Sequence, residues 1–381
     1  MLKIITVIGT RPEAIKMALL IQQMKKQRSI KNYVCVTAQH RSMLDQVLDF
    51  FSIQPDFDLN IMQGNQHLNT VTGSIISGLD DIYASVQPDL VLVHGDTNTS
   101  FAAALAAFYR KIPVGHVEAG MRTGNMHLPF PEEANRVLTS RIVNFHFAPT
   151  EENVKNLRRE GIKKSSIIKT GNTVIDSLLF TRKNVSGFSE HVKDKSLLKA
   201  VAGKNKIILV TGHRRENFGA GFKSICAALR EIAIRFPEVN IIYPVHLNPN
   251  VKGPVTEMLG QVNNIILTEP MMYPDFVYLM KRSHILLTDS GGIQEEGPSL
   301  GKPVLVMRSV TERPEAVKSG TVLLVGTNKN KIVKNTGRLL LDTSFYNKMS
   351  RRINPYGDGK ASSRIVKWLV SNSSLIKKTF E

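Results

Sequence analysis

Short apolar runs alternate with longer amphipathic segments along almost the whole chain of 381 residues. Such runs are typical of strands buried on both faces, and the segments between them are long enough for crossover helices. In the first half the predicted strands are 3–9, 33–37, 90–94, 114–118, 145–148 and 167–170. In the second half they are 206–211, 240–243, 265–267, 285–288, 304–307 and 322–325. This pattern predicts an α/β fold with parallel sheets.

The two halves of the chain open alike. Residues 4–11 read Ile-Ile-Thr-Val-Ile-Gly-Thr-Arg and residues 207–214 read Ile-Ile-Leu-Val-Thr-Gly-His-Arg, so each half predicts a strand, a Gly turn, a basic residue and a helix. A single core rarely grows to this length. We therefore predict two Rossmann-like, doubly wound domains that face a central cleft. The predicted parts are an N-terminal domain 1–180, a polar connection 181–205, a C-terminal domain 204–362, and a helix in 363–381 that crosses back to the first domain.

Composition narrows the class of protein. The net charge is +18, from 50 Lys plus Arg against 32 Asp plus Glu, but the basic residues are scattered and lack the interleaved aromatic residues of nucleic-acid binding surfaces. We expect a basic surface that serves a small anion. Cys35 and Cys226 stand far apart in apolar segments and are expected to be reduced core thiols. No apolar run is long enough for a membrane span and no signal peptide is recognised, so a cytoplasmic location is expected.

The segment 289–303 has the pattern of an anion-binding turn. It follows a predicted strand and precedes a helix-like stretch, and it begins Asp-Ser-Gly-Gly. Ser290, Gly291 and Gly292 would offer free backbone N–H groups at a helix start, where a diphosphate can approach closely. Glu295 and Glu296 follow about one turn later, where a carboxylate can bind ribose hydroxyls. A plain tight turn with acidic residues near a helix start remains the alternative from this segment alone.

Other unusual polar residues also follow predicted strands. Arg11 and Lys16 come after the first strand, and two cations near one turn favour an anion. Asp96 and Glu118 end neighbouring strands, where a buried carboxylate is costly unless it is paired or used, so they suggest acid/base chemistry. His213 would join them from the second half. The acids Glu132 and Glu133, at another helix start, and His246 also have purely structural interpretations.

Several familiar signatures are missing from the sequence. It has no GxGxxG dinucleotide fingerprint, no GxxxxGK[ST] phosphate loop, no HExxH metal motif and no GxSxG nucleophile elbow. The chemistry is therefore expected to depend on carboxylates, histidine and cations.

Taken together, these motifs resemble one family, the non-hydrolysing UDP-N-acetylglucosamine 2-epimerases of bacteria. The matching segments are 9–16, 37–41, 94–97, 115–124, 131–136, 213–217, 244–249, 289–303, 311–316 and 354–362. The resemblance follows the chain in order over essentially its whole length. It implies the two-domain GT-B arrangement, a homodimer, and reversible conversion of UDP-GlcNAc to UDP-ManNAc for surface polysaccharide synthesis. No cofactor, metal, nucleic acid or membrane partner is implied.

The resemblance also implies roles for individual residues. The acid/base group would be Asp96, Glu118, Glu132 and His213. The residues implied to contact substrate are Arg11, Lys16, Arg136, Met271, Phe276, Ser290, Gly291, Gly292, Glu296 and Arg313. Many bacterial members bind a second UDP-GlcNAc as an activator, and the matching positions are Gln39, His40, Gln46, Gln66, Arg214 and His246. The implied route eliminates UDP to form a glycal and then adds it back, with closure of the cleft around the intermediate.

The sequence departs from the common family pattern in three places. Met271 stands where Gln is frequent near the uracil, residues 308–314 read Arg-Ser-Val-Thr-Glu-Arg-Pro, and Asn65 replaces a frequent Arg in the activator site. Activation by substrate is thus less firmly implied than catalysis. Alternative interpretations are an epimerase for a modified sugar of the diacetamido uronic acid type, a hydrolysing epimerase, and a UDP-sugar-binding regulator without catalysis.

Overall fold

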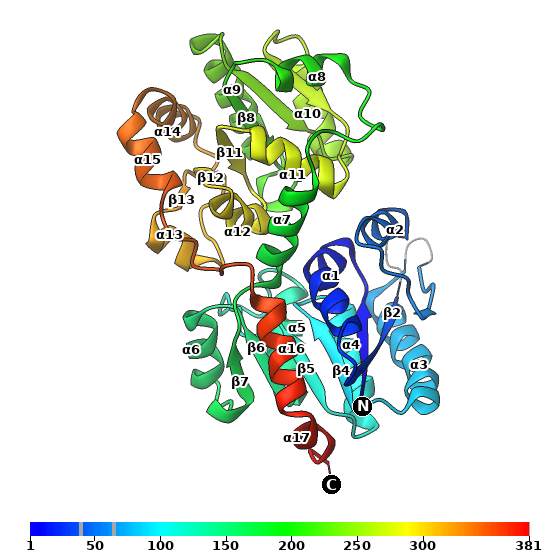
Figure 1. Ribbon diagram of the computed structural model, residues 1–381. Coiled ribbons are helices and arrows are strands. Elements are labelled where there is room, and N and C mark those ends of the chain that lie inside the picture. The colour runs from blue at the N-terminus through cyan, green and yellow to red at the C-terminus, as the bar shows by residue number, and fades with distance from the viewer. Residues whose placement is uncertain (38–40, 63–65, 381) are drawn as a thin grey trace. The chain divides into compact units, whose positions relative to one another are not determined.

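The chain forms two compact units in a computed structural model that describes residues 1–37, 41–62 and 66–380 (Figure 1). The first unit contains residues 1–177 and 356–381, and the second contains residues 178–355. The division at residue 177 falls inside helix α7 (Thr173–Asn184), and the chain returns to the first unit at Tyr356. Within the described residues, no helix combines the length and apolar character that crossing a lipid bilayer requires.

The first unit is built on a parallel sheet in the order β3-β2-β1-β4-β5-β6-β7. Its strands are β1 Leu2–Ile8, β2 Ile30–Val36, β3 Phe57–Asp58, β4 Leu90–His94, β5 Val114–Val117, β6 Phe145–Ala148 and β7 Ile167–Lys169. Its helices besides α7 are α1 Arg11–Lys25, α2 Arg41–Phe50, α3 Leu68–Val86, α4 Asn98–Tyr109, α5 Glu132–Ile142, α6 Glu151–Arg159, η1 Lys164–Ser166, α16 Ala361–Ser371 and α17 Ser373–Lys377.

The second unit has its own parallel sheet, in the order β10-β9-β8-β11-β12-β13. Its strands are β8 Ile207–Thr211, β9 Asn240–Pro244, β10 Ile265–Thr268, β11 Ile285–Thr288, β12 Val304–Val306 and β13 Val322–Leu324. Its helices are α8 Lys195–Ala202, η2 Arg215–Asn217, α9 Ala220–Arg235, α10 Pro249–Leu259, α11 Tyr273–Arg282, α12 Gly291–Ser299, α13 Pro314–Ser319, α14 Lys329–Leu341 and α15 Thr343–Ser350.

Both sheets are doubly wound, which confirms the predicted fold class. Strand order reverses between β1 and β4 in the first unit and between β8 and β11 in the second. In open parallel sheets, ligands bind beyond the carboxyl ends of the strands at this switch point. The runs that predicted strands are buried because helices cover both faces of each sheet. Cys35 and Cys226 are buried free thiols in the two cores, as predicted.

The end of the chain packs on the first unit through helix α16, which lies against α1. Trp368 contributes an aromatic cluster there, with ring centroids 4.9 Å from Phe145 and 5.4 Å from Phe147. The start of α16 is held by Asp176, whose carboxylate accepts the backbone N–H groups of Ala361 (3.1 Å) and Ser362 (2.8 Å). Apolar burial and these hydrogen bonds together anchor the last segment.

Candidate functional site

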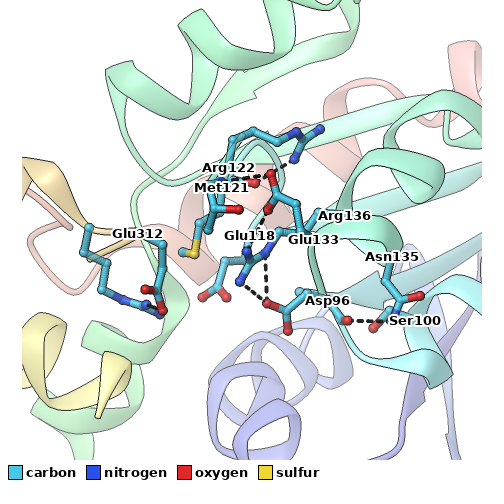
Figure 2. A network of polar contacts seen from close by, with 12 residues as sticks. Asp96, Ser100, Glu118, Met121, Arg122, Glu133, Asn135, Arg136 and Glu312 are labelled. Atoms are coloured by element: carbon cyan, nitrogen blue, oxygen red, sulfur yellow. Dashed lines mark hydrogen bonds and ion pairs between the residues drawn. The ribbon is translucent and has the colours of Figure 1, made fainter. Parts of the chain in front are cut away.

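Beyond the ends of β4 and β5, an arginine joins two carboxylates in the first unit (Figure 2). Arg136 donates from Nε to Asp96 Oδ2 at 2.9 Å and from Nη1 to Glu133 Oε2 at 2.9 Å. Its guanidinium is buried, while the Asp96 carboxylate keeps 26% of its surface exposed. Asn135 also donates to the backbone oxygen of Asp96 at 3.0 Å. Asp96 is therefore held as an oriented, partly exposed carboxylate at the sheet edge.

The Glu133 carboxylate forms hydrogen bonds with the backbone of its own unit. Its Oε1 accepts the backbone N–H groups of Thr123 (2.9 Å) and Gly124 (3.0 Å), and the residue is 1% exposed. These contacts support the structural interpretation of Glu133.

The neighbouring Glu132 begins α5 and is partly exposed, and its Oε2 lies buried without a hydrogen-bond partner in the described part of the chain. Burying a carboxylate oxygen without a hydrogen bond costs free energy unless a proton or a hydrogen-bond donor is supplied from elsewhere.

Glu118 is a buried acid with an unusual backbone conformation. It follows β5 with φ +67°, a left-handed conformation that costs energy for a glutamate and often marks a functional position. Its Oε2 accepts from Lys16 Nζ at 2.5 Å and from Asn172 Nδ2 at 3.0 Å. His94 Nε2 lies 3.7 Å from the same oxygen. The structure thus brings predicted residues Lys16 and Glu118 into direct contact.

The turn after β1 is organised by Glu13, a residue the sequence analysis did not select. Its Oε2 accepts the backbone N–H groups of Gly9 (3.0 Å) and Thr10 (2.7 Å), and its Oε1 accepts from the hydroxyls of Thr97 and Ser100. Burial raises the pKa of this carboxyl, and the four donors act in the opposite direction. The Thr-x-x-Glu capping box was the signal available in the sequence. Arg11 begins α1 directly after this turn and is partly exposed.

In the second unit, Asp289 organises the turn that carries His213. This fully buried carboxylate accepts the backbone N–H groups of His213 (2.9 Å) and Arg214 (2.9 Å) through Oδ2. His213 Nδ1 lies 3.3 Å from Asp289 Oδ1, and the imidazole stacks on His246 with centroids 5.7 Å apart. Burial lowers the pKa of His213, against the opposing effect of Asp289. His213 is 40% exposed at its side chain, so it is oriented from within and accessible from outside.

The turn for which anion binding was predicted lies between β11 and the start of α12. Ser290 is the N-cap residue, and Gly291 opens the helix after β11. A Cβ at Gly291 would lie 2.4 Å from Arg313 Nη1, so the guanidinium packs directly against the turn. Arg313 donates to Glu295 and Glu312, each at 2.6 Å. The positive charge of Arg313 is therefore balanced by two carboxylates. We expect Arg313 to stabilise the shape of the turn as well as to add a cation there.

The residues predicted around the ribose and uracil lie on α11, α12 and the loop before α11. Glu296 Oε1 accepts from the hydroxyl of Tyr273 at 2.9 Å, and Phe276 is partly exposed on α11. Met271 lines a cavity of about 410 Å³ together with Val245, Leu267 and Met272. The same cavity is also lined by charged side chains, among them Lys193, Lys252 and Glu269, so Met271 lies at a mixed polar and apolar surface where the family pattern often has Gln.

The predicted activator site stays a prediction. Gln39 and His40 lie outside the described residues, Gln46 is exposed on α2, and Gln66 is partly exposed before α3. Arg214 precedes η2 and lies 3.9 Å from Glu312. Within residues 1–37, 41–62 and 66–380, no three His, Cys, Asp or Glu side chains gather as they would around a metal ion.

Comparison with known proteins decides the family. The family profile described as UDP-N-acetylglucosamine 2-epimerase matches residues 22–370. The chain belongs to this family. The resemblance noted from the sequence is thereby confirmed.

Relatives and solved structures agree over nearly the full length. UDP-N-acetylglucosamine 2-epimerase of Escherichia coli K12 is 57% identical over 375 residues, covering 97% of this chain and 99% of that protein. The Yersinia pestis protein of the same name is 56% identical over 369 residues, covering 97% and 98%. The crystal structure of UDP-GlcNAc 2-epimerase from Neisseria meningitidis bound to UDP-GlcNAc has a TM-score of 0.90 at 51% identity, covering 97% of this chain and 100% of that one.

Proposed function

We propose that this member of the epimerase family interconverts UDP-GlcNAc and UDP-ManNAc by inverting C2 of the sugar. The observation that carries the proposal is identity above 50% over nearly the whole length to enzymes named for this reaction. The strand-end acids support it, since Asp96 and Glu118 are each oriented by a cation of their own unit, Arg136 and Lys16.

The proposed route is an elimination followed by re-addition. A base removes the C2 proton while the bond between C1 and the UDP oxygen breaks, which leaves a C1=C2 double bond and free UDP. UDP then attacks C1 again, and a proton returns to C2 on the opposite face. This route needs acids and bases around the ring and cations or N–H donors on the departing diphosphate.

We assign the acid/base group to Asp96, Glu118, Glu132 and His213, without dividing the two proton transfers among them. The N–H groups of the Ser290–Gly292 turn and Lys16 would hold the diphosphate or sugar, and Glu296 the ribose. Several geometries favour these roles: Ser290 caps α12, Asp289 orients His213, and Glu132 has a buried oxygen in need of a donor. Five further points stay predictions: that both units act on one substrate, that the protein closes around UDP, that it forms a homodimer, that it supplies surface polysaccharide synthesis, and that it is cytoplasmic.

Proton NMR of the purified protein with UDP-GlcNAc in heavy water tests the proposal. We expect UDP-ManNAc with deuterium at C2, at an equilibrium reached from either sugar. Free ManNAc and UDP would indicate a hydrolysing enzyme, whereas no change would contradict the proposed activity and leave a modified sugar or a binding role. Glu118→Gln should lower the rate at least about 100-fold, as removal of a general acid or base does. Glu151→Gln, which changes an exposed acid on α6, is the matched control.

A further inference from the structure

His94 is a buried histidine whose ring has no hydrogen-bond partner among the residues that the structure describes. The residue is 2% exposed, and neither Nδ1 nor Nε2 has a partner in the described part of the chain. Two other buried histidines of the same unit differ. His116 Nε2 lies 2.7 Å from the oxygen of Gly95, and His146 Nε2 lies 3.0 Å from the oxygen of Ser140. Leaving a buried polar group unpaired costs free energy, so the His94 ring needs an explanation that packing alone does not supply.

The ring is directed at the Glu118 carboxylate. His94 Nε2 is 3.7 Å from Glu118 Oε2, just beyond hydrogen-bond distance. Lys16 and Asn172 occupy that same oxygen at 2.5 and 3.0 Å. A shift of under about 1 Å would bring the imidazole within hydrogen-bond range of the carboxylate.

The protonation state of His94 follows from its surroundings. Burial lowers its pKa to about 4, against the raising effect of Glu118 and Asp96, and Lys16 lowers it further. The ring is therefore neutral near pH 7 and carries one N–H group. A bare lone pair directed at a carboxylate oxygen would be repelled, so the hydrogen belongs on Nε2, the nitrogen that faces Glu118.

We propose that His94 is a positioning residue for Glu118 and donates from Nε2–H to its carboxylate during turnover. The inference rests on the proposed function. An anionic diphosphate competes with Glu118 for the Lys16 ammonium. As that cation is drawn away, Asn172 and His94 keep the carboxylate oriented and ionised. Held this way, Glu118 keeps its geometry without a permanent ion pair that would weaken it as a base.

Three variants test this role by turnover. His94→Leu removes the donor and should lower kcat roughly 10- to 100-fold, the size expected for one hydrogen bond to a charged group, with KM within about twofold. His94→Gln can place an N–H near the position of Nε2 and should recover most of kcat. His146→Gln changes a buried histidine bonded to Ser140 and should leave kcat unchanged. Unchanged kcat in His94→Leu, or equal impairment of His94→Leu and His94→Gln, would overturn the inference.

A spectroscopic measurement separates this inference from the proposed activity. ¹⁵N NMR of the histidine-labelled wild type should show His94 neutral at pH 7 and protonated on Nε2, with the Nε2–H signal moving downfield when UDP is added. A ring protonated on Nδ1, or a signal insensitive to saturating UDP, would contradict the inference. An inactive wild type would remove the proposed function, and the tautomer and its response to UDP would still decide whether His94 serves Glu118.

Discussion

The turns after β1 and β8 have nearly the same sequence pattern and different structures. In the first unit, the N–H groups of Gly9 and Thr10 are accepted by Glu13, three residues further along, and α1 begins at once at Arg11. In the second unit, the N–H groups of His213 and Arg214 are accepted by Asp289, at the end of another strand. The same need for acceptors is met locally in one unit and through the tertiary structure in the other.

The segments after the two turns differ accordingly. The capping box of Thr10 and Glu13 continues directly into a helix of 15 residues. After β8 the chain instead forms the short η2, and α9 begins only at Ala220. The predicted order of strand, Gly turn, basic residue and helix leads directly to a long helix in the first unit, whereas in the second unit the short η2 comes before the long helix. The irregular segment presents His213 at the sheet edge.

The two units also differ in their buried histidines. We therefore expect the largest difference between the units in how much stability each loses in acid. In the first unit His94 and His116 are fully buried, and burial lowers their pKa values to about 4 and about 3. The two histidines bind protons less readily in the folded state than in the unfolded state. Their contribution to the stability of the folded state is therefore fully present above pH 6.5. That stability is lost as pH falls toward 4, at roughly 2–3 kcal/mol for each histidine.

We expect the first unit to open before the second when pH falls from 7 to 4.5. The single Trp368 reports on the first unit by fluorescence, and hydrogen exchange of peptides reports on both units. In the second unit burial lowers the pKa of His284 to about 4 and also lowers that of His213, so that unit should lose stability in acid as well, but less than the unit that contains both His94 and His116. Replacement of His116 by Phe should flatten the pH dependence. Earlier opening of the second unit would break the comparison.

Removing the long-range acceptor should have the next largest effect. Asp289→Ala leaves two partly buried backbone N–H groups and the buried Asn217 amide without this acceptor, at about 3–4 kcal/mol of unfolding free energy. Urea unfolding combined with hydrogen exchange measures the loss, which should be concentrated around residues 212–220. Glu13→Ala is the matched change in the first unit. It should cost less, about 2 kcal/mol, since the hydroxyls that bond it can rotate to other acceptors. Equal losses would remove the distinction.

The two turn glycines should also respond unequally to alanine. A Cβ at Gly9 would lie 2.1 Å from Thr99 Oγ1, whereas a Cβ at Gly212 would lie 2.9 Å from Tyr243 Oη. Gly9→Ala therefore forces α4 and the turn apart and should cost about 1–3 kcal/mol. Gly212→Ala overlaps less, because it meets the hydroxyl of the buried Tyr243 ring at a longer distance, and it should cost less than Gly9→Ala, about 1 kcal/mol. Thermal unfolding of both variants measures the order, and a larger loss at Gly212 would contradict it.

The smallest predicted effect concerns the residue after each glycine. Thr10 is the N-cap of α1, so Thr10→Ala should cost about 1 kcal/mol of stability. His213 stands at the matching position but caps no helix, and His213→Ala should change stability by less than about 0.5 kcal/mol. Chemical denaturation of the two variants gives the comparison. A cost at His213 as large as that at Thr10 would mean that its stacking on His246 also supports the fold.

Much of the fold could be predicted because its signals are local. Apolar runs such as 90–94 and 285–288 mark buried strands wherever they occur, and they form β4 and β11. β3 has only two residues and no such run, so the sequence pattern missed it. In the candidate site, Asp96 and Glu118 could be selected because carboxylates at strand ends are conspicuous. Which cation pairs with which acid could not be predicted, since Arg136 is 40 residues from Asp96 and Lys16 is 102 residues from Glu118 along the chain.

The sequence by itself determined the fold class, the family and the residue types at the sheet edges, because hydrophobic periodicity and turn chemistry act over a few residues. It also contained the capping box that builds the turn after β1. Only the tertiary structure decided which charges meet. Lys16 contacts Glu118, Arg136 orients Asp96, and Asp289 holds the turn of His213. These pairings depend on strand order in each sheet, and strand order arises from packing between segments that are far apart in the chain.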